Sequence, residues 1–475
     1  MRILAVSTYD LGTQPLILAR LKSRLAEARY RVKTLDLSLV ALTNDDISRA
    51  DVIIFSIPMH TALALTKELV EKIRMIDKDM PLCFFGLYGP AAISANLLAP
   101  KDIAIAGGGF ETLLSWLDSL TQSGTTKLAH NKLHIDLGPA KPSSLIKPDR
   151  TDFLPLDNYM HYMEGEQRKT VATIETVYGC SHHCKHCPVP VIYNGRTRKF
   201  PEEEILADAA GQIGAGAEHI HFSDPDFFNR PDYAMKIVSL LKKDFPGITF
   251  DATIKISHIL KYAHLLEELS EQGCRMIITA LEQVTDSTLQ ILDKGHTKKD
   301  SQIAFELLRN AGIEPRPSLL PFTPWTKRQD LLELLDFILE NDLAWNVDPV
   351  QWSIRLLLPP GSLLLEASDK VLTDALDGLS EDGLSYNWHS PDPILDLLAV
   401  QIGRLAEKEA ASSPFEAYFK IRELVYEAFE IKDPGAKIKP SSASKIPGDL
   451  RPRLSENWFC CAAPTENQKS QMTCR

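Results

Sequence analysis

Two stretches of the chain alternate short apolar runs with amphipathic segments, and this alternation constrains the fold more than any other feature. In residues 1–120 the apolar runs are RILAVST, RVKTLDL, DVIIFSI, LCFFGLY and DIAIAGG. The segments between them include PLILARLKSRLAEA, TKELVEKIRMI and ETLLSWLDSL. Continuous apolar strands separated by helices are typical of a parallel sheet covered on both faces. We therefore predict a small doubly wound α/β domain over residues 1–120, with ligands at the carboxyl ends of its strands.

The same alternation resumes over residues 169–365. The expected strands are TVATIETV, HIHFSD, TFDATI, RMIITAL, EPRPSLLPF and VQWSIRLLL, with helices such as PEEEILADAAGQIGA and RQDLLELLDFILEN between them. Six strand–helix units in a stretch of this length suit a partial (β/α)6 barrel better than a complete eight-unit barrel, which needs roughly 250 residues. Functional residues are expected at the carboxyl ends of these strands.

Three further segments complete the predicted organisation. Residues 121–168 contain Pro, Gly and Ser throughout and predict a linker. Residues 366–432 predict a helical C-terminal region, with PILDLLAVQIGRLAEKE and PFEAYFKIRELVYEAFEI as its helices. Residues 433–475 are rich in Pro, Ser and Lys and predict an extended tail that carries thiols.

Composition narrows the classes of function. The net charge of −11 argues against a general nucleic-acid binder, which usually carries a basic excess. We see neither a signal peptide nor an apolar run of the ~18 residues that a membrane span needs, so we expect a cytoplasmic protein without membrane partners. Thiols stay reduced in that compartment. Six of the eight cysteines fall into two clusters, which favours metal or redox chemistry, whereas Cys83 and Cys274 lie in apolar runs and are expected in the core.

The first cluster, Cys180, Cys184 and Cys187, directly follows the run TVATIETV. A structural zinc site needs four ligands, and three histidines of the same loop could supply the fourth: His182, His183 and His186. A zinc-stabilised binding protein that senses soft metals is therefore one alternative. Three thiolates on a [4Fe–4S] cluster instead leave one iron open for a substrate or cofactor.

The CxxxCxxC spacing after the first strand of a partial barrel resembles the radical S-adenosylmethionine (SAM) superfamily. This resemblance implies a [4Fe–4S] cluster whose open iron chelates the amino and carboxylate groups of SAM. It implies that an electron from the cluster cleaves the sulfonium and makes a carbon radical. A reducing donor such as a flavodoxin or ferredoxin is then expected as a partner. The family usually has an aromatic residue before the third cysteine, where this chain has His186.

The resemblance also suggests residues that contact SAM. FSDPDFF stands where the family often has a Gly-Gly-Glu-like stretch that meets the SAM amine, so Asp224 and Asp226 are candidates, although either could simply cap a strand-end turn. Lys255 could pair with the SAM carboxylate or be a solvated lysine. In the cobalamin-domain branch of the family the fourth strand ends in Gly-X-Glu-Ser, and the matching Glu282 is expected to accept hydrogen bonds from the ribose. Further candidates on the last two strands are Ser318, Gln351 and Arg355.

A small α/β domain before such a barrel resembles the cobalamin-binding arrangement, with IAIAGGGFETLLSWL as its closing Gly-rich turn and helix. The usual Asp-X-His-X-X-Gly loop, whose histidine ligates cobalt, does not occur before residue 120, and His60 is the only histidine there. We predict a scaffold domain without cobalamin. The alternative is a domain that holds cobalamin without a protein ligand to cobalt.

The second cluster, in FCCAAPTENQKSQMTCR, contains Cys460, Cys461 and Cys474. These thiols could be incidental, could form a regulatory dithiol, or could capture a soft ion such as trivalent arsenic. A group of radical SAM proteins with a degenerate cobalamin-type domain ends in Cys-Cys-Ala-Glu-Pro, which CCAAP resembles except at Ala463. That group is similar to the enzyme that makes the carbon–arsenic bond in arsinothricin biosynthesis.

The tail resemblance implies transfer of the 3-amino-3-carboxypropyl group of SAM to arsenite, which the three tail thiols would present as catalytic groups. A cobalamin-dependent radical SAM methyltransferase, or another radical SAM enzyme acting on a small metabolite, is the alternative among enzymes.

Overall fold

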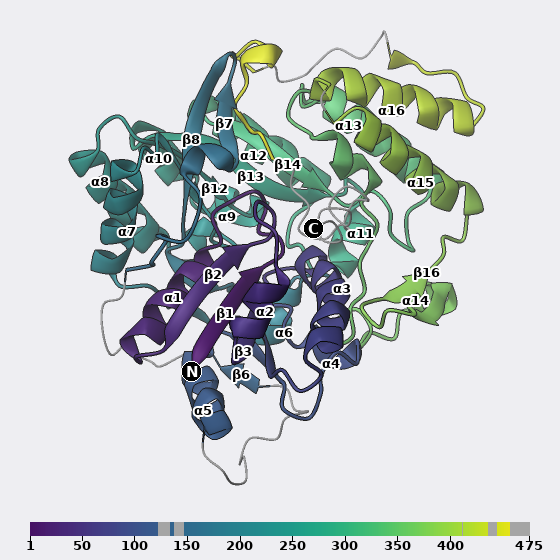
Figure 1. Ribbon diagram of the computed structural model, residues 1–475. Helices are drawn as coiled ribbons and strands as arrows, with labels where there is room; N and C mark the ends of the chain where they lie inside the picture. The colour runs from purple at the N-terminus through teal and green to yellow at the C-terminus, as the bar shows by residue number, and fades with distance from the viewer. Residues whose placement is uncertain (122–133, 137–146, 411, 436–443, 457–475) are drawn as a thin grey trace.

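The computed structural model describes residues 1–121, 134–136, 147–410, 412–435 and 444–456, and contains two main sheets with helices around them (Figure 1). The first is a six-stranded parallel sheet in the order β2-β1-β3-β4-β5-β6. Its strands are β1 (Arg2–Ser7), β2 (Arg31–Asp36), β3 (Val52–Ser56), β4 (Leu82–Phe85), β5 (Ile103–Gly107) and β6 (His134–Asp136). Its helices are α1 (Leu16–Glu27), α2 (Asn44–Arg49), α3 (His60–Ile76), α4 (Ala91–Ser94) and α5 (Phe110–Thr121).

The helices cover both faces of this sheet. Apolar side chains of α1 and α5, including Leu21 and Trp116, form one core with the sheet, and those of α2 and α3, including Ile47 and Leu63, form the other. The doubly wound domain predicted from the alternating runs is confirmed. Strand β6 comes from the stretch predicted as linker and adds a sixth strand, three residues long, to the edge of the sheet.

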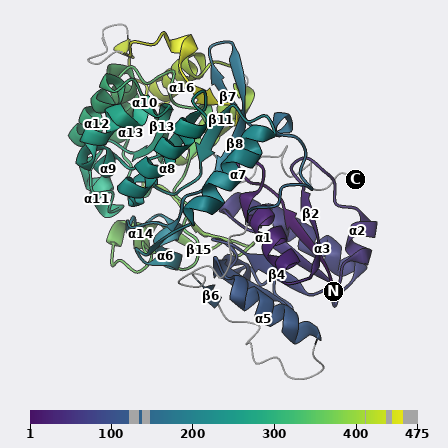
Figure 2. The same cartoon turned by 90° about the vertical axis from the view of Figure 1, so that its left-hand side faces the viewer.

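The second sheet has seven strands in the order β14-β13-β12-β11-β8-β7-β17. Five are parallel: β8 (Gln167–Ile174), β11 (His219–Phe222), β12 (Thr249–Thr253), β13 (Cys274–Glu282) and β14 (Glu314–Leu319). Its outer helices include α7 (Glu202–Gly214), α8 (Pro231–Asp244), α9 (Ile256–Lys261), α10 (Leu266–Glu271), α11 (Asp286–Ile291), α12 (Lys298–Asn310) and α13 (Arg328–Glu340). In Figure 2 α8, α9, α10, α12 and α13 lie on the side away from the first sheet, whereas α7 lies next to α1. This is a partly closed barrel, as predicted.

The sixth predicted strand differs from the expectation. VQWSIRLLL begins in a 3-10 helix, η4 (Pro349–Ser353), and contributes one isolated bridge, between Arg355 and Phe322. Pro349 has no N–H to donate to a sheet ladder. Trp352 is buried beside Tyr418, with ring centroids 5.6 Å apart, so apolar packing against the C-terminal helices replaces strand pairing.

The C-terminal region contains α14 (Lys370–Ala375), the hairpin β15 (Leu376–Leu379) and β16 (Tyr386–Trp388), α15 (Pro393–Lys408) and α16 (Pro414–Ala428). Beyond it, β17 (Arg453–Leu454) pairs antiparallel with β7 (His161–Glu164), so part of the predicted tail joins the barrel sheet. The three tail cysteines, Cys460, Cys461 and Cys474, lie outside the described residues.

Two buried arginines join the domains next to the cysteine loop. Arg20 of α1 forms an ion pair with Glu175, and its guanidinium lies 3.6 Å from the centroid of Phe200. Arg150 pairs with Asp208 at 2.9 Å and donates to the carbonyl of Thr173 at 2.7 Å. Across the described ranges, none of the helices combines the length and apolar character that a bilayer span requires.

Candidate active site

A cavity of about 210 Å³ lies at the carboxyl ends of the barrel strands. Tyr88, from the turn between β4 and α4 of the first domain, contributes to its wall. The other polar or metal-ligating side chains that line it are Cys180, His182, Cys184, His186, Cys187, Asp226, Thr253, Lys255, Glu282, Lys294, Ser318 and Gln351. The carboxyl edges of both sheets therefore meet at one site, where parallel α/β folds bind their ligands.

The loop that carries the three cysteines is fixed at both ends. Gly179 ends β9 (Val177–Gly179) with φ +76°, and a Cβ there would collide with the carbonyl oxygen of Arg196, which precedes the paired strand β10 (Thr197–Lys199). Glycine is therefore required directly before Cys180. At the other end, Cys187 caps α6 (Pro188–Tyr193), whose first residue is proline.

The three thiols suit a metal cluster. Cys180 and Cys184 are buried, and burial together with the charge of Asp226 raises the pKa of Cys180 to about 11, so without a metal this thiol stays protonated. A bound metal deprotonates coordinating thiols. Within the described part of the chain the cavity has no fourth sulfur ligand. A three-thiolate set of this kind fits a [4Fe–4S] cluster with one open iron.

Glu282 lies at the centre of a buried ion network beside the cluster ligands. It ends β13 in the left-handed conformation, φ +61°, and its Oε1 accepts from Lys294 Nζ at 3.0 Å and lies 3.3 Å from His186 Nε2. Burial alone would raise the pKa of Glu282, but Lys294 and His186 hold it well below its usual value. A strained backbone at a cavity edge is typical of functional positions. His186 replaces the expected aromatic residue as a hydrogen-bonding group.

Asp226 is also in the cavity wall, but its carboxylate is already surrounded. Oδ2 lies 2.9 Å from His182 Nε2 and 3.0 Å from His258 Nδ1, and accepts from the backbone N–H of Lys255 at 3.2 Å. Oδ1 accepts from the backbone N–H of Phe228 at 2.9 Å. Burial opposes ionisation, yet the two histidines lower the pKa of Asp226.

Of the two lysines that line the cavity, Lys294 is paired with Glu282, and Lys255 is the one whose ammonium can bind a ligand. It caps α9, and its ammonium has no hydrogen-bond or ion-pair partner among the residues that the structure describes. It is thus available for an anionic ligand. Ser318 on β14 is half-buried, and Gln351 on η4 accepts from the backbone N–H of Leu319 at 3.0 Å.

Two residues expected to contact SAM do not line the cavity. Asp224 accepts from the N–H and hydroxyl of Thr176 at 2.9 and 2.6 Å, so it caps the turn after β8, and burial raises its pKa to about 7. Arg355 points to the C-terminal region, where it pairs with Asp396 at 2.6 Å and lies 4.1 Å from the ring centroid of Trp388. The partners of both residues, Thr176 for Asp224 and Asp396 for Arg355, lie more than forty residues away in the sequence.

The carboxyl edge of the first domain has its own unsatisfied groups. Ser7 and Ser56 are in register at the ends of β1 and β3 and are fully buried, and their hydroxyls find no hydrogen-bond partner among the residues that the structure describes. His60, the histidine considered for cobalt, is buried with its ring 6.2 Å from that of Tyr88 and does not line the cavity. The Nδ1 of His60 is also buried without a hydrogen-bond partner among the described residues, so all three groups fit a hydrogen-bonding ligand at this edge.

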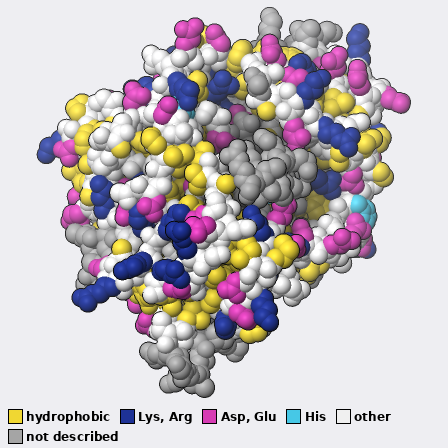
Figure 3. Space-filling model, in the orientation of Figure 1, with side chains coloured by type: hydrophobic (Ala, Val, Ile, Leu, Met, Phe, Trp, Pro, Cys, Tyr) yellow, Lys and Arg dark blue, Asp and Glu magenta, His cyan; other side chains and the backbone are white. Residues whose placement is uncertain are grey.

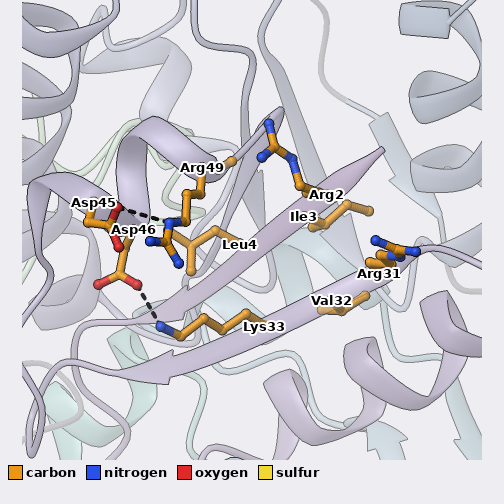
Figure 4. A pocket seen from close by; sticks show the side chains of 10 residues that line it. Arg2, Ile3, Leu4, Arg31, Val32, Lys33, Asp45, Asp46 and Arg49 are labelled. Carbon is orange, nitrogen blue, oxygen red and sulfur yellow. Dashed lines mark hydrogen bonds and ion pairs between the residues drawn. The ribbon is translucent and has the colours of Figure 1, made fainter.

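A second groove, of about 280 Å³, lies at the opposite, amino-terminal edge of the first domain (Figure 4). Four basic side chains line it: Arg2, Arg31, Lys33 and Arg49. Two carboxylates neutralise part of this charge, since Lys33 pairs with Asp46 at 2.6 Å and Arg49 with Asp45 at 2.9 Å. Basic and acidic side chains are interspersed over this face (Figure 3). Exposed ion pairs of this kind stabilise little and indicate an ordinary solvated surface.

Comparison with known proteins supports the interpretation of this cavity as a radical SAM site. Residues 174–338 match the model of the Radical SAM superfamily. The chain is 26% identical over 188 residues to ribosomal protein uS12 methylthiotransferase RimO of Bacteroides fragilis, which covers 36% of this chain and 41% of that protein. It thus spans about two-fifths of that relative's length. An uncharacterized methyltransferase of Pyrococcus horikoshii is 23% identical over 442 residues, 88% of this chain and 90% of that protein.

Two solved structures share the fold over most of the chain. The cobalamin-dependent SAM radical enzyme OxsB, with aqua-cobalamin bound, has a TM-score of 0.63 and 14% identity, covering 90% of this chain and 73% of that one. The radical SAM methyltransferase TsrM of Kitasatospora setae, with cobalamin and a [4Fe–4S] cluster, has a TM-score of 0.56 and 14% identity, covering 92% and 90%. Residues 174–338 are therefore a radical SAM domain. Over most of its length the chain shares the fold of the cobalamin-dependent radical SAM structures OxsB and TsrM.

Proposed function

We propose that this enzyme transfers the 3-amino-3-carboxypropyl group of SAM to arsenite and so forms the carbon–arsenic bond of arsinothricin biosynthesis. The observation that carries the SAM-dependent part is the convergence of three cluster thiols, Lys255 and Glu282 on one cavity. When bound, the [4Fe–4S] cluster supplies the electron that starts SAM cleavage. The charges of the cavity match those of SAM, with a cation for its carboxylate and an acceptor for its ribose hydroxyls.

Each lining residue has a distinct role in this proposal. Cys180, Cys184 and Cys187 hold the cluster. Lys255 binds the carboxylate of SAM, since its ammonium has no competing partner within the described residues. Glu282 accepts from the ribose with the oxygen that Lys294 and His186 leave open. Ser318 and Gln351 are proposed to complete the wall around the nucleoside.

The transfer is balanced with arsenite as the acceptor. One carbon–sulfur bond of SAM breaks, one carbon–arsenic bond forms, and methylthioadenosine leaves. The carbon radical forms the new bond with one electron of the As(III) lone pair, and the second electron of the pair replaces the one that the cluster supplied. Arsenic thus becomes As(V), and one hydroxyl proton of arsenite is released to water. The thiols Cys460, Cys461 and Cys474 are proposed to present As(III), and the support for this part is the resemblance of the CCAAP tail. The initial electron requires a reducing partner such as a flavodoxin or ferredoxin.

A second candidate is cobalamin-dependent methyl transfer. Two observations favour it: the fold shared with OxsB and TsrM, and the orphaned hydroxyls of Ser7 and Ser56 at the ligand edge of the first domain. The lack of an Asp-X-His-X-X-Gly loop before residue 120 supports our preference for a scaffold role. Titration of the purified protein with cobalamin separates the two, since tight binding would favour the second candidate.

The direct test is to incubate reconstituted protein anaerobically with SAM, reductant and arsenite. We expect methylthioadenosine and an aminocarboxypropyl arsenical in equal amounts. Deoxyadenosine or methylated arsenic as the main product would refute the proposed transfer. The double variant C460S/C461S should lose transfer to arsenic and keep its iron, whereas replacement of the isolated buried cysteine in C83A should keep both.

A further inference from the structure

Three side chains with metal-ligating atoms meet beside the cluster loop, and the proposed transfer uses none of them. His182 lies between the first two cluster cysteines, Asp226 caps the 3-10 helix η2 (Phe227–Asn229) after β11, and His258 lies in α9 after β12. Their ligand atoms all lie within 4.8 Å of one another. Since His182 and Asp226 line the cavity, this group borders the same space as the cluster ligands.

The distances within this group are those of ligands around one ion. Asp226 Oδ2 lies 2.9 Å from His182 Nε2 and 3.0 Å from His258 Nδ1. With metal–ligand bonds of about 2.0–2.2 Å, neighbouring ligand atoms are separated by roughly 2.9–3.5 Å in octahedral or tetrahedral coordination. A small shift of the ligand atoms would therefore accommodate an ion between them.

His258 provides an independent indication of a ligand. The residue is 9% exposed, and its Nδ1 lies 3.0 Å from Asp226 Oδ2 without a well-aligned hydrogen bond to any of the described residues. A buried imidazole nitrogen whose one close partner is poorly aligned is costly, and a bound ion would remove that cost. The other side of the ring packs against Tyr262, with centroids 5.5 Å apart, and His182 lies 4.3 Å from it, so the ring is held in this orientation.

We propose that His182, Asp226 and His258 bind one divalent transition-metal ion, separate from the [4Fe–4S] cluster. Two imidazoles and one carboxylate form a set that suits Zn²⁺ or Fe²⁺ and leaves at least one coordination position open. Since His182 and Asp226 line the cavity, the ion would lie at its wall and could hold an oxygen ligand of the acceptor there as a Lewis acid. This site goes beyond the proposed transfer and replaces the SAM amine as the partner of Asp226.

The charged groups around the site predict how one substitution changes its affinity for zinc. The carboxylate of Asp226 favours a cation, whereas the ammonium of Lys255 lies in the same cavity and disfavours it. The variant K255M should therefore bind zinc more tightly than the wild type. A hydrogen-bonded network without a metal would give no zinc binding in either protein.

The test uses the whole cluster-loaded protein, equilibrated with Zn²⁺ and desalted. We expect one zinc per chain in addition to the cluster iron. Zinc K-edge absorption should show nitrogen or oxygen at about 2.0–2.1 Å with imidazole scattering, and no sulfur shell at about 2.3 Å. The iron of the cluster does not contribute at this edge. H258Q and D226N should each lose this zinc at least tenfold in affinity, and H264Q, which changes an exposed histidine of the next turn, should retain it.

Two results would overturn the proposal. The first is less than a fifth of an equivalent of zinc in the wild type. The second is a sulfur shell that persists in H258Q, since zinc would then occupy thiols. Circular dichroism and iron content check that the variants fold. K255M keeps all three ligands and should raise the zinc affinity, whereas H258Q and D226N should lower it. Loss of SAM cleavage with normal zinc binding would count against the proposed transfer and leave this site unaffected.

Discussion

Replacement of Lys294 by methionine tests the buried ion network most sharply. Lys294 is 3% exposed and pairs with Glu282, itself 8% exposed, at 3.0 Å. Removing the ammonium leaves a buried carboxylate, and breaking such a pair costs about 3–5 kcal/mol. His186 remains 3.3 Å from the same oxygen, so we expect a value near the lower end, about 3 kcal/mol.

Local opening of the barrel is the appropriate quantity, because a chain of this size does not unfold in two states. Hydrogen exchange of peptides covering β13 and α12 should become roughly 100-fold faster in K294M at pH 7.5, with cluster content matched to the wild type. The depressed pKa of Glu282 means that the pair stabilises the fold at neutral pH and that this stabilisation is lost as the pH falls through the folded-state value.

Two comparisons make the experiment decisive. The double variant E282Q/K294M removes both charges and should recover a large part of the lost protection. K370M, which breaks the exposed pair with Asp374, should change protection by less than about 0.5 kcal/mol. Exchange in K294M within twofold of the wild type, or a double variant as unstable as the single one, would refute the buried-pair account.

Three further outcomes are expected. G179A places a Cβ against the carbonyl of Arg196, so it should lose most of its iron after reconstitution, and full iron content would contradict the tight turn. Because burial raises the pKa of Asp224 to about 7, the folded state binds a proton that the unfolded state releases. The free energy of local opening around the turn after β8 should therefore fall by up to about 4 kcal/mol as the pH rises from 4 to 7, and D224N should flatten this dependence in hydrogen exchange corrected for the intrinsic pH dependence of exchange. K255M should weaken SAM binding, measured by calorimetry, about tenfold or more. R355M should leave SAM affinity within twofold of the wild type but lower the melting temperature, because it breaks the pair with Asp396. The reverse pattern would overturn our assignment of the cavity cation.

The order of elements followed from sequence because both sheets are built from continuous apolar runs. Each of the first five predicted barrel strands and all five predicted strands of the first domain are present, within a few residues of their expected ends. Periodicity could not show that VQWSIRLLL avoids the sheet, since its path depends on the burial of Trp352 against α16. The short strands β6 and β17 carry too few residues to give a period.

The site could be predicted where its ligands lie close together in the sequence. It could not be predicted where the direction of a side chain depends on the conformation of a turn. Cys180, Cys184, Cys187 and Glu282 line one cavity because spacing and strand ends determine their position. Asp224 and Asp226 are two residues apart, and only the three-dimensional turn decides which one reaches the cavity. Arg355 turns away because Asp396 and Trp388, which follow far along the chain, provide its partners. His258 had one sequence signal, its place one helical turn after Lys255, and Tyr88 had one too, its place at the carboxyl end of the predicted strand LCFFGLY.

The account rests on an open iron that binds SAM, and electron paramagnetic resonance of the reduced cluster tests it most directly. Reconstituted wild-type protein should contain about four irons per chain. Addition of SAM should change the spectrum of the reduced cluster, and SAM labelled with ¹⁵N at its amino group should show hyperfine coupling to it. A colourless zinc protein, or a cluster whose spectrum is the same with and without SAM, would contradict the central claim.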